Sequence, residues 1–343
     1  MTPKTMTVLC LCLCLATAGV VAPANAQLPG PSADAAHAAP DEAAMTAAHE
    51  AYTASLAGRL ADSGDARNLA LAAWLRDLRQ AAPAAGPAPS VADAQARAWR
   101  GLAFQRAGTD PVALALLSGA AAAAPDDPVP AQALARWRQL EPANLVPALL
   151  AGVQGAELIA AAGHARSAHG HAVAQVRWIA DAVRRHPPDA ATLAVLAPDA
   201  TGVDGLAVMT GWSYLAGYAL PDYGVLVDAC RRTSAETAAA CRNAATVLQA
   251  GDTRLAEAVG LSLARDLAPT REARRAAEAA RLRFDWQMFE TGHLSGRAPA
   301  QQLGEYVRLL GNPALDTEAA LNLEQLRLAG IPLDPPPGWR PPR

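Results

Sequence analysis

The sequence is poor in aromatic residues and almost without lysine, and each shortage excludes some classes of function. Aromatic residues make up 4% of the 343 residues, although 52% are hydrophobic. The only lysine is Lys4, so no lysine amine beyond it can form a Schiff base or serve a phosphate-binding loop. The formal net charge is −3, so no basic footprint for a nucleic acid is present and we expect no nucleic-acid partner.

Motifs of common enzyme families are also missing. We find no Gly-x-Ser-x-Gly nucleophile elbow, no glycine-rich dinucleotide loop and no calcium loop. His164, His169 and His171 lie close together, but Gly163 and Gly170 interrupt the helix that would align them. We therefore expect histidines that are solvated or lie in a loop, and we assign no catalytic residue, no cofactor and no metal.

Residues 1–26 are typical of a secretory signal peptide. Lys4 supplies a positive start, residues 8–21 are apolar and uncharged, and Ala24-Asn25-Ala26 has the small residues that signal peptidase requires. The apolar stretch is short for a membrane helix, and no later stretch approaches 18 strongly apolar residues. We expect cleavage after Ala26, a periplasmic or secreted protein, and no membrane span after cleavage.

Alanine is abundant in the rest of the chain and favours helices over strands. Residues 27–40 are rich in Ala, Pro and small polar residues, which predicts a disordered linker. Residues 41–332 alternate helical segments with short breaks, and a sub-boundary fits the break near 187–202. Residues 333–343 are proline-rich and predict a polyproline-like tail. The pattern predicts an all-α fold, an irregular stack of antiparallel helical pairs.

Several helix ends follow from local chemistry. Asp110 followed by Pro111 predicts an N-cap with proline at the first helical position. Gly251 followed by Asp252 predicts a C-cap glycine and a new N-cap, so two helices should meet there with almost no loop. Such short connections make consecutive helices antiparallel neighbours.

Three short motifs carry a family resemblance. Two of them, Trp99-x-x-Leu102-Ala103 and Trp212-x-x-Leu215-Ala216, resemble the first-helix signature of tetratricopeptide repeats. The third, Leu140-Glu141-Pro142-Ala143-Asn144, resembles the junction between such repeats. The chain thus resembles tetratricopeptide-like helical repeat proteins and is similar to uncharacterised exported proteins of proteobacteria. The resemblance implies a tetratricopeptide-like solenoid over roughly residues 65–267; a non-repeating α bundle is the alternative.

The tryptophans have two interpretations. Large rings fill gaps between alanine-rich helices, which places the tryptophans in the core. Alternatively, some of them line a partner-binding groove with arginines at its rim, because Trp and Arg anchor interfaces. The candidate groove residues are Trp99, Trp137, Trp178, Trp212, Arg136, Arg138 and Arg177.

Two cysteines, Cys230 and Cys241, remain after signal cleavage. On one continuous helix they would lie about 16 Å apart, which is too far for a disulfide. A helix that ends before Ser234 and a second that begins there would bring them together across a hairpin. An oxidising compartment favours the bond, so we expect a Cys230–Cys241 disulfide.

These observations favour an exported, non-enzymatic binding or scaffolding protein whose partner is a protein or peptide of the cell envelope. Helical stacks offer extended surfaces for such partners. The alternative is an α-helical envelope enzyme that acts on glycan or peptidoglycan. A large pocket with two convergent carboxylates would favour the enzyme, and a shallow groove would favour the binding protein.

Overall fold

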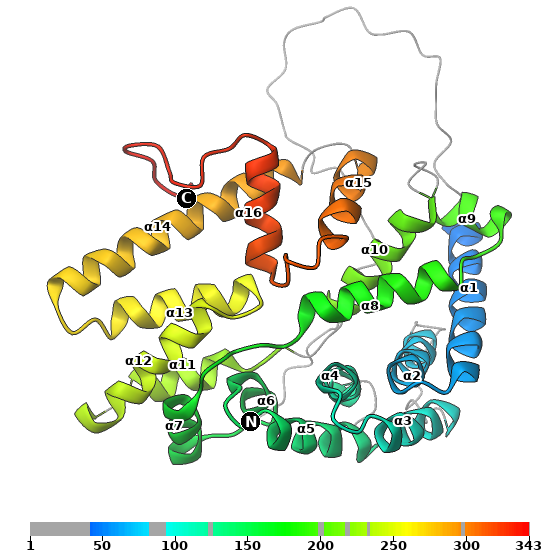
Figure 1. Cartoon of the computed structure of the whole chain (residues 1–343), viewed down its shortest axis with the longest axis horizontal. Coiled ribbons are helices and arrows are strands. Elements are labelled where there is room, and N and C mark those ends of the chain that lie inside the picture. Colours follow the sequence, from blue (N-terminus) through cyan, green and yellow to red (C-terminus); the bar gives the residue numbers. More distant parts are fainter. Residues whose placement is uncertain are drawn as a thin grey trace, which may run out of the picture. The chain divides into compact units, whose positions relative to one another are not determined.

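The computed structural model describes residues 42–81, 94–122, 126–197, 202–216, 220–231, 234–295 and 299–342 (Figure 1). These residues belong to one compact unit and contain sixteen α-helices, one 3₁₀ helix and no strand. The helices are α1 (Glu42–Ser63), α2 (Ala66–Ala81), α3 (Ala94–Arg106), α4 (Pro111–Ser118), η1 (Gly119–Ala122), α5 (Val129–Leu140), α6 (Leu145–Leu150), α7 (Gly155–His164), α8 (Ala172–Arg185), α9 (Ala190–Leu196), α10 (Gly202–Ala216), α11 (Tyr223–Arg231), α12 (Ala235–Gln249), α13 (Arg254–Asp266), α14 (Arg271–Leu294), α15 (Pro299–Leu310) and α16 (Glu318–Leu328).

The structure confirms the all-α prediction. The helix α8, for example, occupies Ala172–Arg185 within the predicted helical region 41–332. The helix α9 was not predicted; it lies in the break near 187–202, where Asp189 caps its first turn. The predicted signal peptide, 1–26, and linker, 27–40, lie outside the described residues.

Two hydrophobic clusters form the core. The larger one extends through helices from α1 to α13 and is built mainly from Ala, Leu and Val. The smaller one joins α8 and α10 to α15 and α16 through Val173, Val176, Val208, Leu309, Leu310 and Leu321. The helices α8 and α10 lie side by side and contribute to both clusters (Figure 1). They therefore connect the two parts of the core.

One predicted helix start is confirmed and one is wrong. The Asp110 carboxylate accepts hydrogen bonds from the backbone N–H groups of Val112 and Ala113, as an N-cap before Pro111 should. Asp252 does not cap α13, because Thr253 holds that position and accepts from the Ala256 N–H. The buried Asp252 side chain instead binds the loop before α8, so a tertiary contact has replaced the predicted local one.

The C-terminal tail lies along α14 (Figure 1). Trp286 of α14 donates an indole hydrogen bond of 2.8 Å to the carbonyl oxygen of Pro332. Arg283 pairs with Asp334 at 2.6 Å. The proline-rich tail therefore has a binding partner within the same chain.

No helix in the described part of the chain combines the length and the apolar character needed to cross a membrane.

Candidate functional site

The first candidate site is a hollow of 270 Å³ between α1, α2 and α3. Its floor comes from α1 and consists of very small residues, Ala54, Ala57, Gly58 and Ala61. A side chain added at Gly58 would meet no atom within 4 Å of its Cβ, so the floor is open above that residue. The hollow can therefore receive a side chain from a ligand.

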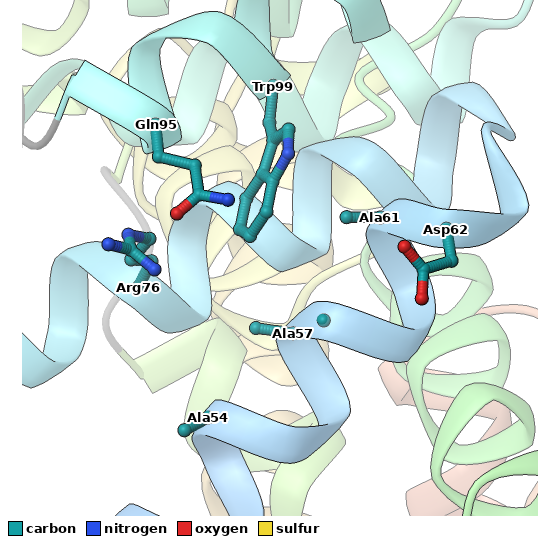
Figure 2. A pocket seen from close by; sticks show the side chains of 8 residues that line it. Ala54, Ala57, Ala61, Asp62, Arg76, Gln95 and Trp99 are labelled. Carbon is teal, nitrogen blue, oxygen red and sulfur yellow. The ribbon is translucent and has the colours of Figure 1, made fainter.

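Trp99 of α3 gives this hollow its aromatic wall. Its ring is half-buried, and the guanidinium carbon of Arg76 lies 5.7 Å from the ring centroid. Figure 2 shows the indole standing between Gln95 and Arg76 on one side and Ala61 and Asp62 on the other. A cation near an indole face is attracted by the ring's electron density. The hollow thus offers an aromatic surface between a positive and a negative side chain.

The second candidate site is a hollow of 390 Å³ between α5, α6 and α7. Arg138 on α5 contributes to its lining and forms an ion pair of 2.8 Å with Glu157 of α7. Glu141 and Asn144, from the turn between α5 and α6, also line it. Both belong to a polar network beside the hollow.

Glu141 is the centre of that network. Its Oε2 accepts hydrogen bonds from Trp137 Nε1 at 2.7 Å and from Asn144 Nδ2 at 2.8 Å. His171 Nε2 lies 3.2 Å from both carboxylate oxygens. Burial alone would raise the pKa of Glu141, but the two hydrogen bonds and the nearby His171 outweigh it and hold the pKa below its ordinary value.

His171 is fixed in an unusual backbone conformation. Its φ is 58°, and it is the only non-glycine residue with positive φ among the described residues. Asp252 accepts hydrogen bonds from the N–H groups of Gly170 and Ala172, on either side of it. His171 thus stands at the end of the loop, at the N-cap position of α8, and its side chain is 20% exposed. Glu141 and His171 are 30 positions apart in the sequence, so sequence analysis could not predict that they form a pair.

The seven predicted groove residues lie in different environments. Trp99 lines the first hollow and Arg138 the second. Trp137 is completely buried, so it belongs to the core and cannot line a groove. The structure therefore does not join the seven residues into one groove.

The other four predicted groove residues make contacts within the fold. Trp178 packs against the larger cluster, and Trp212 packs against the smaller one with Tyr306 at 6.0 Å. Arg136 lies over the Phe104 ring at 4.0 Å. Arg177 donates to the carbonyl oxygens of Leu310, Asn312 and Leu315, and so holds α8 to the α15–α16 loop.

Cys230 and Cys241 lie at disulfide distance, with their Cα atoms 5.6 Å apart. The helix break that this pairing requires is present, since α11 ends at Arg231 and Ser234 stands at the N-cap position of α12. The Ser234 side chain makes no capping hydrogen bond to the backbone. The pair therefore joins two consecutive helices, as the predicted hairpin between them requires.

Among the described residues, no three His, Cys, Asp or Glu side chains are grouped so that they could hold a metal ion. The three clustered histidines have separate partners. His164 Nδ1 lies 2.7 Å from the Ala160 carbonyl oxygen, and His169 binds Asn144 through its backbone.

Comparison of the chain with protein-family models, curated proteins and solved structures found no match.

Proposed function

We propose that this chain is an exported, non-enzymatic binding protein that holds a protein or peptide segment in the cell envelope. The observation that carries the proposal is the half-buried Trp99 ring above a floor of alanine and glycine. Tryptophan and arginine are the residues that most often anchor interfaces. Export rests on the signal-like residues 1–26.

The hollow suits an extended segment with one apolar anchor side chain. The anchor would pack on Trp99 and on the open floor at Gly58. Arg76 and Asp62 lie on opposite sides of the ring, so they favour a ligand with an acidic group on one side of its anchor and a basic group on the other (Figure 2). The resemblance to tetratricopeptide-like proteins supports the same kind of ligand, because stacked helices present such surfaces to peptides.

The geometry favours binding over the glycan-acting enzyme. Glycoside hydrolysis uses two carboxylates on either side of the scissile bond. The first hollow described above is lined by one carboxylate, Asp62, and the second also by one, Glu141.

Blocking the hollow tests the proposal. The variant Gly58→Leu places a side chain in the open floor, and its Cβ meets no neighbouring atom, so the fold should be retained. The matched control is Gly304→Leu in α15, another helical glycine with no atom within 4 Å of an added Cβ. Each tagged protein is incubated with an envelope extract, and bound proteins are identified by mass spectrometry.

We expect a partner that the wild type and Gly304→Leu retain and that Gly58→Leu and Trp99→Ala lose. Circular dichroism confirms that each variant is helical. Equal capture by Gly58→Leu and the wild type would exclude the hollow as the binding site.

A further inference from the structure

The tail is recognised through its backbone at consecutive residues. Trp286 Nε1 donates to the Pro332 carbonyl oxygen at 2.8 Å, and Gln287 Nε2 donates to that of Leu333 at 3.2 Å. Within the tail the Trp339 N–H donates to the Pro336 carbonyl oxygen, whereas the carbonyl oxygens of Pro332 and Leu333 accept from donors outside the tail. The helix α14 supplies two such donors from adjacent residues. These contacts do not depend on which side chains the tail carries at those positions.

Charge and aromatic contacts add selectivity to this recognition. Arg283 Nε lies 2.6 Å from Asp334 Oδ1, just before the three prolines. After them, Gly338 has φ 82°, a left-handed conformation that glycine adopts readily, and the chain turns back. The Trp339 ring then lies 5.4 Å from Trp286 and 6.0 Å from Phe289, between centroids. The tail is therefore held at both ends of its proline run.

Few of the tail residues are buried. Every residue from Pro332 to Gly338 except Pro335 is exposed, and the Arg283–Asp334 ion pair is open to water. Exposed ion pairs contribute little, and segments with few buried contacts open at low free-energy cost. The tail can therefore leave α14 without unfolding the helices beneath it.

We propose that Arg283, Trp286, Gln287 and Phe289 form a binding surface for a proline-rich segment of another polypeptide, and that the chain's own tail occupies this surface as an intramolecular competitor. The segment that fits has an acidic residue before its prolines and a tryptophan after them. Aromatic side chains that bind extended proline-rich segments are a general mode of peptide recognition. A tethered competitor acts at a high effective concentration, so an external segment binds well only when the tail is weakened. The site is separate from the Trp99 hollow and does not depend on the function proposed there.

Fluorescence anisotropy with a labelled peptide tests the proposal on the full chain. The probe has the sequence of residues 331–343, IPLDPPPGWRPPR. The wild type should bind the probe weakly, and Trp339→Ala should bind it about tenfold or more tightly, because the internal competitor has lost its aromatic anchor. Adding Trp286→Phe to Trp339→Ala removes the indole donor and should weaken binding again.

Exchanging the charges of the ion pair gives a second test, and it changes no residue of the hydrophobic core. Arg283 is 56% exposed, so Arg283→Glu should leave the fold intact. In the Trp339→Ala background, this change should weaken binding of the probe and strengthen binding of a probe with lysine in place of Asp334. Arg275→Glu, an exposed change on the same helix, is the control and should alter neither affinity. No probe binding to Trp339→Ala, or no reversal of preference with Arg283→Glu, would overturn the proposal.

Discussion

The Arg100 guanidinium donates from Nε to the Asp127 carboxylate at 2.7 Å, and both side chains are almost completely withdrawn from water. Arg100 also pairs with Asp77 of α2, which is buried as well. One arginine of α3 thus pairs with two carboxylates from different parts of the chain. Burying charge is costly unless partners compensate it, so the three residues depend on one another.

Replacing Arg100 by leucine should destabilise the fold by about 3–5 kcal/mol, because two buried carboxylates lose their counter-ion. The measurement is the free energy of unfolding from denaturant titration. Adding Asp77→Asn and Asp127→Asn should recover part of the loss, since the amides remove the uncompensated charge. A loss below about 0.5 kcal/mol, typical of a surface change, would contradict this account.

At Gly260 the backbone of α13 lies very close to that of α12. A Cβ added there would lie 2.6 Å from the Gln249 nitrogen and 2.7 Å from the Ala245 carbonyl oxygen. Gly260→Ala should therefore cost about 1–3 kcal/mol through overpacking, although alanine is the better helix former. In Gly304→Ala the added Cβ is free, and the stability should rise by up to about 1 kcal/mol. Thermal unfolding of both variants checks the opposite signs.

The pair Cys230–Cys241 should be oxidised in protein folded under oxidising conditions. Thiol titration of the denatured, non-reduced protein should find no free thiol. Because the bond closes a short loop, reduction should lower the free energy of unfolding by about 2.5–3 kcal/mol in the chain-entropy model. A variant with serine at both positions should show no further change with reductant. Two free thiols per chain would refute the bond.

Glu141 should make stability depend on acid pH. The pKa of Glu141 is lower in the folded protein than the ordinary value of 4.5. Its contribution to the free energy of unfolding is therefore complete above that value and disappears as the pH falls through the folded pKa. Glu141→Gln removes an ionised acceptor, and should cost about 1–3 kcal/mol at pH 7. The difference from the wild type should shrink below pH 4.5. Denaturant titrations across this range measure it, and a constant difference would contradict the assignment.

Local features of this chain could be predicted from sequence because their physical causes are local. The carboxylate of Asp110 reaches the free N–H groups of the turn that follows it, so its capping role needs no other part of the chain. The hairpin between Cys230 and Cys241 likewise depends on a break between neighbouring helices. The all-α class follows from the same alanine-rich, capped segments.

Residues that look alike in the sequence lie in different surroundings, and only the tertiary structure decided which. Trp99 and Trp137 look alike in sequence, but Trp137 is enclosed by neighbouring helices and Trp99 stands at a hollow because the α1 residues beneath it are alanine and glycine. Asp252 could have capped α13, but it binds loop N–H groups about 80 residues away. Contacts between distant segments depend on how the helices pack, and a helical pattern specifies a buried face without specifying what covers it.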